Sequence, residues 1–407
     1  MKIQDDYLTI NILINEETGI VQKTFLRTPN SQQRSEQTFN LNGKFVIPGL
    51  VDIHCHLRDF KESSKETLFT GARAAAAGGY TTVFDMPNKI PPMINLKDLD
   101  RFTKKTNKIF FTTIIPYLLL NSKTNSHLLS EYSFFKAYFG ETTGNYQTSE
   151  EDILSFIKAE GKFLSIHAED NTLIELNTKK YKDRVKDHCM IRDPSTETKA
   201  INRIITLKNS VKSNSTIHFA HVTLKESVIS LTSNFCSFEA TPHHLSLNQN
   251  DYEKLGTWGK MNPPLRSKKE QLDLWNLYLD GQIPIIATDH APHTKKEKLE
   301  VFLSGIPGLE TALAVILNKL KPINEEKMDL IMNTFSLNPR KLMGLSNSFG
   351  IQENEIADLT IIDPSKEKIV LADELQTKCK WSPWEGHKLC GWPVLTIHRG
   401  QISFSEI

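Results

Sequence analysis

The sequence has almost no net charge and no long apolar run. Lysine and arginine number 49 against 48 acidic residues, a formal charge of +1 at pH 7. So balanced a chain creates no global field to recruit nucleic acid or an anionic membrane, and we expect neither as a partner. No stretch approaches the roughly 18 uninterrupted apolar residues that a membrane span needs.

Paired cysteines are also missing. The five cysteines form no C-x-x-C spacing, which argues against a disulfide framework or a structural zinc site. The N-terminus, Met1-Lys2-Ile3-Gln4-Asp5-Asp6, lacks the basic and apolar regions of a secretory signal. We therefore expect a cytoplasmic protein with reduced thiols.

From Phe45 onward, short β-rich runs alternate with longer helical patterns such as 65–77, 149–160 and 196–212. The expected strands are 45–53, 79–84, 109–115, 134–138, 162–167, 215–221, 235–240 and 283–288. Eight β-α units predict an α/β fold of the (β/α)8 TIM-type barrel class. A doubly wound sheet is the competing architecture, but the polar residues discussed below fall on too many strand ends for a single crevice.

Both ends of the chain have a different pattern. Residues 1 to about 44 alternate weakly, as small antiparallel strands do, and strand-like runs return after about Gly350 at 357–362 and 394–397. We predict a small β-sandwich domain built from both termini, residues 1–49 plus 347–407. The barrel would then occupy residues 50–346.

The most informative motif is His54-Cys55-His56, which closes the apolar run at 45–53. Alternate residues of a strand point the same way, so the two imidazoles converge. Two histidines on one face can hold a single divalent ion. Taken alone, such spacing is also common among core or surface histidines.

Other polar residues recur at the expected strand ends, where barrel enzymes build their active sites. Each has a structural alternative: a capping or packing histidine, a solvated lysine, or an aspartate N-cap. Together they predict a metal centre. The candidate ligands are His54, His56, Lys136, His167, His221 and Asp289.

Lys136 needs its own explanation, because an ammonium repels a dication. Its apolar neighbours in 134–139 would lower its pKa and favour reaction with carbon dioxide to a carbamate, an oxygen donor that can bridge two ions. His54, His56 and Asp289 would then hold one ion, and His167 and His221 the other. Nitrogen-rich ligands favour two zinc ions per chain, bridged by carbamylated Lys136, although manganese or cobalt also fits.

Several segments resemble the signature segments of the dihydroorotases, a branch of the metal-dependent amidohydrolase superfamily. They are His54-Cys55-His56-Leu57-Arg58, Asp85-Met86-Pro87-Asn88, Met261-Asn262-Pro263-Pro264-Leu265-Arg266 and Asp289-His290-Ala291-Pro292-His293. The C-terminal segments 381–386 and 391–394 resemble the family's closing β domain. The resemblance therefore covers nearly the whole chain.

The resemblance implies reversible hydrolysis of dihydroorotate in pyrimidine biosynthesis, with Asp289 as general base and acid. The ring carboxylate of this substrate needs a fixed cation, and Arg58 follows His56 closely enough to supply it. The family pattern places Arg58, Asn88 and His293 on that carboxylate, and Asn262 and the backbone of Gly305 on the pyrimidine edge. A homodimer, or association with another pyrimidine-pathway enzyme, would be compatible with this function.

Some segments depart from the family pattern. The loops after Arg58 and Asn88 differ from those of relatives, and 140–145 lacks the aspartate that bridges the metals in some bacterial dihydroorotases. The missing aspartate favours the Lys136 carbamate. Two alternatives stay open: a cyclic amidohydrolase of allantoinase-like or hydantoinase-like specificity, and a catalytically silent scaffold.

Overall fold

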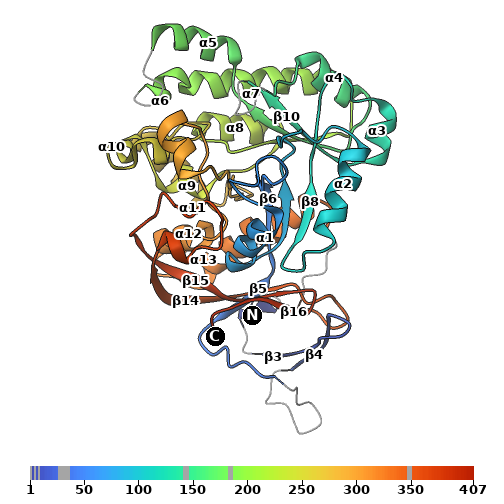
Figure 1. The fold of residues 1–407 in the computed structure, drawn as a ribbon, viewed down its shortest axis with the longest axis vertical. Helices are drawn as coiled ribbons and strands as arrows, with labels where there is room; N and C mark the ends of the chain where they lie inside the picture. Colours follow the sequence, from blue (N-terminus) through green and yellow to red (C-terminus); the bar gives the residue numbers. More distant parts are fainter. Residues whose placement is uncertain are drawn as a thin grey trace.

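The computed structural model describes residues 2–3, 6–7, 10–25, 37–140, 146–181, 187–345 and 351–407. Figure 1 shows a barrel surrounded by helices, with a smaller layer of strands at one end near both termini. Among the described residues, no helix is long and apolar enough to cross a membrane.

Parallel strands form the barrel wall in two hydrogen-bonded groups. The first group is β6 (Leu50–Cys55), β7 (Tyr80–Asp85) and β8 (Thr113–Pro116). The second is β9 (Leu118–Leu119), β10 (Phe134–Phe139), β11 (Phe163–Ala168), β12 (Thr216–Phe219) and β13 (Ser237–Phe238). Only Tyr117 separates β8 from β9, so these two short strands continue one another and join the groups.

The segment around Ile286 closes the barrel. Isolated parallel bridges join Ala240 to Ile286 and Cys55 to His290. The expected regular strand at 283–288 is therefore replaced by single bridges. Pro284 has no N–H to donate, and the N–H of Thr288 bonds to a side-chain oxygen of Asp52 at 3.0 Å rather than to a neighbouring strand.

The apolar run at 45–53 is not one strand, as expected, but two. β5 (Phe45–Pro48) pairs with the C-terminal β14, whereas β6 enters the barrel. The chain changes partners at Gly49, whose N–H bonds to the carbonyl of Asp358 at 2.8 Å. A Cβ on Gly49 would lie 2.2 Å from the Thr81 hydroxyl, so the crossing point has no room for a side chain.

Helices cover the outside of the barrel. The patterns at 65–77, 149–160 and 196–212 correspond to α1 (Leu68–Ala77), α4 (Glu150–Lys158) and α7 (Pro194–Asn209). Capping boxes at Thr67 and Ser149 explain why α1 and α4 begin where they do. The apolar faces of these helices pack on the strands in the main core cluster.

The remaining α-helices vary in length. They are α2 (Leu96–Thr106), α3 (Ser126–Glu131), α5 (Asn171–Lys180), α6 (His188–Ile191), α8 (Lys225–Ser233), α9 (Pro242–Ser246), α10 (Tyr252–Leu255), α11 (Lys268–Leu279), α12 (Ala312–Leu320), α13 (Glu325–Met332) and α14 (Asn338–Leu342). The short 3-10 and π turns are η2 (Gln249–Asp251), η3 (Gly256–Gly259), η4 (Glu297–Val301), η5 (Asn333–Leu337) and η6 (Ala372–Glu374).

Strands from both termini form the smaller β layer (Figure 1). An antiparallel sheet has the order β16 (Gln401–Ser405), β15 (Lys388–His398), β14 (Leu359–Ile369), β5. The hairpin of β3 (Asn11–Asn15) and β4 (Ile20–Phe25) packs on it, and β1 (Lys2–Ile3) pairs with β2 (Asp6–Tyr7). The division into 1–49 plus 347–407 and 50–346 stays a prediction, and residues 346–350 lie outside the described part.

Candidate active site

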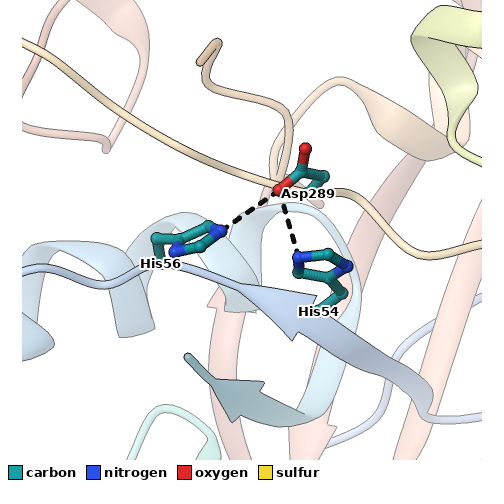
Figure 2. Close-up of side chains that lie close together, drawn as sticks. All are labelled: His54, His56 and Asp289. Carbon is teal, nitrogen blue, oxygen red and sulfur yellow. Dashed lines mark hydrogen bonds and ion pairs between the residues drawn. The ribbon is translucent and has the colours of Figure 1, made fainter. Parts of the chain in front are cut away.

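His54, His56 and Asp289 meet at one point in the barrel. The two histidines come from the end of β6, and Asp289 follows the closing segment. Nε2 of His54 lies 3.3 Å, and Nε2 of His56 3.2 Å, from the same Asp289 oxygen, as Figure 2 shows. One potential ligand atom from each residue lies within 4.8 Å of the others, and all three side chains are buried. The alternation of β6 thus gives the convergence that the sequence predicts.

Hydrogen bonds set the orientation of both imidazoles. Nδ1 of His54 lies 2.5 Å from Glu239 Oε1, and Nδ1 of His56 lies 2.7 Å from Asn88 Oδ1. An imidazole that donates from Nδ1 presents the lone pair of Nε2. Burial lowers the pKa of both histidines, which keeps them neutral and able to bind a metal.

A second histidine pair lies beside this cluster. His167 ends β11, and its Nδ1 lies 2.8 Å from Nε2 of His221. On its other side, Nε2 of His167 lies 2.8 Å from Glu169. The rings of His54 and His221 are 5.3 Å apart, so the two groups of ligands are adjacent. Burial and the neighbouring histidines hold the pKa of His221 well below its usual value.

Lys136 is fully buried on β10, facing the barrel interior. Its Nζ lies 3.3 Å from the hydroxyl of Ser165. Burial lowers the lysine pKa to about 8, although the negative charges of Glu239 and Asp289 oppose the shift. A neutral amine is therefore accessible near physiological pH, and only the neutral amine reacts with carbon dioxide. Of residues 140–145, cited above for lacking an aspartate, 141–145 lie outside the described part of the chain.

The donor set fits divalent cations. Four buried histidines and a buried aspartate offer nitrogen and carboxylate ligands of the kind zinc prefers. His167 donates toward Glu169, which leaves its Nδ1 lone pair facing His221. Without a cation, Nδ1 of His167 and Nε2 of His221 can face one another only if a proton on one of them forms a hydrogen bond to the other. Burial raises the pKa of Asp289, whereas the charges of His54 and Lys136 lower it.

Sequence reasoning missed the carboxylates behind the histidines. Glu239 bonds to His54 and lies 3.1 Å from Nε2 of His218. Burial raises the pKa of Glu239, but the histidines outweigh this and hold it low. Glu169 could have been found, since it follows His167 by two residues, the same spacing as His54 and His56.

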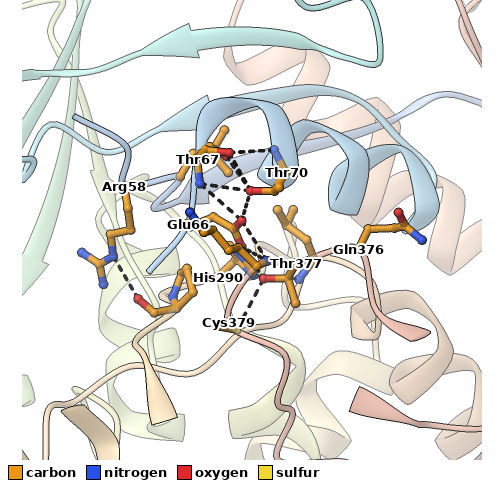
Figure 3. Close-up of polar contacts among 12 residues, drawn as sticks. Arg58, Glu66, Thr67, Thr70, His290, Gln376, Thr377 and Cys379 are labelled. Carbon is orange, nitrogen blue, oxygen red and sulfur yellow. Dashed lines mark hydrogen bonds and ion pairs between the residues drawn. The ribbon is translucent and has the colours of Figure 1, made fainter. Parts of the chain in front are cut away.

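Arg58 follows the candidate ligand His56 by two residues and is buried. Its Nε donates to the carbonyl of Pro292 at 3.2 Å (Figure 3), and its Nη2 lies 3.4 Å from His293. Nε2 of His293 bonds to the carbonyl of Ser304 at 3.0 Å. Burial, together with the charge of Arg58, keeps the pKa of His293 well below its usual value. Arg58 therefore places a buried positive charge against His293.

Asn262 and Gly305 belong to two segments joined to one another. With its amide oriented to satisfy its neighbours, Asn262 donates to the Ser304 hydroxyl at 3.0 Å. Gly305 has a φ of 134°, and its N–H donates to the carbonyl of Lys260 at 2.9 Å. The structure thus brings together the residues expected at the pyrimidine edge, while their contact with substrate stays a prediction.

Two buried carboxylates tie the C-terminal segment 376–378 to the rim of this site. Glu66 accepts from the N–H of Lys378 at 3.0 Å and lies 3.6 Å from Nε2 of His290 (Figure 3). Glu310 accepts from the N–H groups of Gln376 at 2.7 Å and Thr377 at 2.9 Å. The neighbour of Asp289 is thus packed against the C-terminal part of the chain.

The chain is similar to known proteins in both sequence and fold. The sequence model of the amidohydrolase family matches residues 45–402. A dihydroorotase of Pyrococcus furiosus is 35% identical over 409 residues, covering 98% of this chain and 91% of that protein. A dihydroorotase of Pyrococcus abyssi is 38% identical, covering 89% and 84%. The solved L-hydantoinase of Arthrobacter aurescens superposes with a TM-score of 0.89 at 24% identity, covering 97% and 92%, a likeness of fold.

Proposed function

Since the chain belongs to the amidohydrolase family and to its dihydroorotase branch, we propose that it interconverts dihydroorotate and N-carbamoyl-L-aspartate. One observation carries the choice of substrate. Buried Arg58 lies in contact with His293, beside the His54, His56 and Asp289 cluster. A buried cation next to a hydrolytic centre suits a cyclic amide that carries a carboxylate.

In this proposal, His54, His56 and Asp289 would hold one divalent ion, His167 and His221 would hold a second, and carbamylated Lys136 would supply an oxygen ligand to both, with zinc as the expected metal. When bound, such a pair of ions would polarise a carbonyl and lower the pKa of water. Buried neutral imidazoles and a lysine pKa of about 8 support this assignment. The metal identity and the carbamate remain parts of the proposal.

The protein's own residues would act on the substrate as follows. Arg58, with His293 and Asn88, fixes the ring carboxylate, while Asn262 and the Gly305 backbone hold the opposite edge of the ring. Asp289 takes a proton from the attacking water. As the ring C–N bond breaks, Asp289 delivers this proton to the leaving nitrogen. In the direction of ring closure, the protonated carboxyl of Asp289 acts as the acid and water is lost.

The substrate assignment is tested by assaying the zinc-loaded protein with dihydroorotate, hydantoin, allantoin and dihydrouracil. We expect dihydroorotate to have the highest kcat/KM by a wide margin. A preference for a neutral ring would reassign the chain to another cyclic-amide specificity. A protein that binds no metal and converts none of the four would be the silent scaffold.

We further propose that this reaction serves pyrimidine biosynthesis in the cytoplasm. The five cysteines are all free, as a reducing compartment permits. A homodimer, or a complex with another pyrimidine-pathway enzyme, stays a prediction that size measurements on the purified protein would test.

A further inference from the structure

Tyr138 lies next to the proposed metal ligands Lys136 and His167 but takes no part in the proposed mechanism. It follows Lys136 by two residues on β10 and therefore points to the same side of the strand. The alternate residue Phe135 packs outward on Phe156 of α4, with ring centroids 5.7 Å apart. Tyr138 is thus on the interior face of the barrel wall.

Two neighbours of the Tyr138 ring and one backbone hydrogen bond fix the position of the residue. The Tyr138 ring centroid lies 5.5 Å from Nζ of Lys136 and 6.5 Å from the ring of His167, its register partner on β11. Its backbone is held by Thr148, whose N–H donates to the Tyr138 carbonyl at 2.9 Å. The side chain is 3% exposed. Little freedom remains for the ring to turn away.

The hydroxyl of Tyr138 has no hydrogen-bond partner within the described residues. A buried hydroxyl without a partner is costly, and most buried polar groups avoid this state. Tyr117 and Tyr132, by contrast, are paired: Tyr117 donates to the carbonyl of Ile53 at 3.0 Å, and Tyr132 to that of Pro116. The Tyr138 hydroxyl is thus a buried donor beside the proposed metal ligands, available to part of a bound ligand.

The depth of the residue indicates which part of a ligand it would meet. Two residues correspond to about 6.6 Å along a strand, so Tyr138 lies that much nearer the rim than Lys136. Lys136 and His167 flank the ring, which places it at the hydrolytic centre. Arg58 lies beyond the end of its own strand, two residues after His56.

We propose that Tyr138 is a substrate-binding residue whose hydroxyl donates a hydrogen bond to the ring carboxylate that Arg58 holds. The proposal rests on the function proposed above and names one more residue in its specificity. The reacting carbonyl belongs at the depth of Lys136 and Asp289, whereas the carboxylate belongs nearer the rim, beside Arg58. A phenol is a suitable neutral donor to a carboxylate that already has a cationic partner.

Tyr138→Phe tests the proposal, because it removes only the hydroxyl. Tyr80→Phe is a matched control: Tyr80 is also fully buried with an unpaired hydroxyl within the described residues, but it begins β7 at the opposite end of the barrel. Calorimetry on zinc-loaded protein would measure binding of orotate, a carboxylated ring, and of uracil, its neutral counterpart. Assays with dihydroorotate would separate KM from kcat.

We expect Tyr138→Phe to weaken orotate binding by roughly 10- to 100-fold and to raise the KM for dihydroorotate in parallel. Uracil binding, zinc content and Tyr80→Phe should all match the wild type. Unchanged orotate affinity in Tyr138→Phe, or an equal loss for uracil, overturns the role of Tyr138. A wild type that neither converts dihydroorotate nor binds orotate overturns the proposed function instead.

Discussion

Glu239 lies directly behind His54, with its Oε1 2.5 Å from Nδ1 of the imidazole. The other oxygen of this carboxylate is 3.1 Å from His218. The pair fixes which nitrogen of His54 faces Asp289, because a ring that donates from Nδ1 keeps the lone pair on Nε2. Glu239 is therefore positioned to influence how tightly His54 binds a metal ion.

Glu239→Gln should weaken zinc binding by about 10- to 100-fold, as loss of a carboxylate behind a metal-binding histidine typically does. Competition with a chromophoric chelator would measure the change. Glu310→Gln, at another buried carboxylate, is the control and should leave zinc affinity unchanged. Equal zinc affinities for Glu239→Gln and wild type would contradict the supporting role.

Metal removal should abolish activity. We expect purified protein to carry about two divalent ions per chain, because the ligands form two adjacent groups. Dialysis against a chelator should eliminate turnover of dihydroorotate, and zinc should restore it. Elemental analysis of the dialysed protein provides the check, and a metal-free protein with full activity would refute the proposed centre.

Lys136→Ala should lose most of its activity, because the bridging carbamate would have no nitrogen to form on. Short carboxylic acids added to the assay should restore part of the rate by supplying an oxygen donor in the space left behind. Lys298→Met, at another fully buried lysine, should show no such rescue. Mass spectrometry of the intact wild type would detect the carbamate if the sample is kept at neutral pH under carbon dioxide.

Arg58→Met should lower kcat/KM for dihydroorotate by a factor of roughly thirty to several thousand, because losing one partner of a buried charge pair costs on the order of 2 to 5 kcal/mol. Binding of a neutral ring such as dihydrouracil should change little. Arg73→Met, on the exposed side of α1, is the matched control. Equal losses for charged and neutral rings would remove Arg58 from the carboxylate site.

Glu310 should make stability depend on pH. Burial, and to a smaller extent the charge of Glu66, raises its pKa from 4.5 to about 7, although two backbone N–H groups lower it. Because the folded state then holds the proton more tightly, the contribution of Glu310 is greatest below pH 4.5 and is lost as the pH rises through 7. The full change is about 3 kcal/mol.

Glu310→Gln removes this titration. As the pH increases from 4.5 to 7.5, the Tm of the wild type should therefore fall relative to the Tm of Glu310→Gln. Scanning calorimetry at several pH values would measure it. Parallel curves for the two proteins would show that Glu310 does not titrate in this range.

The convergence of the proposed ligands could be predicted because it depends on local rules. Strand alternation places His54 and His56 on one face, and parallel barrel strands bring Lys136 and His167 to the same end. Glu239 also lies near the end of an expected strand, 235–240, but its contact with His54 depends on how strands far apart in the sequence are arranged around the barrel. The local pattern does not show which strand-end carboxylate lies behind a histidine.

The fold shows the same limit. Apolar runs predicted where strands lie, but not where one run divides into two strands that belong to different sheets. The run at 45–53 divides at Gly49, where β5 pairs with β14 and β6 pairs with β7, and this choice of partners is made by tertiary packing. Likewise, Asp52 takes the N–H of Thr288 that a regular eighth strand would have used.

The bridge between Cys55 and His290 also affects how the protein is made. It joins the first barrel strand to the last, and His56 and Asp289, which meet there, are 233 positions apart. During synthesis, the cluster of His54, His56 and Asp289 cannot assemble until residue 289 has left the ribosome and the ring has closed. Nascent chains shorter than this length have no complete cluster, so metal capture through it would be a late event in maturation.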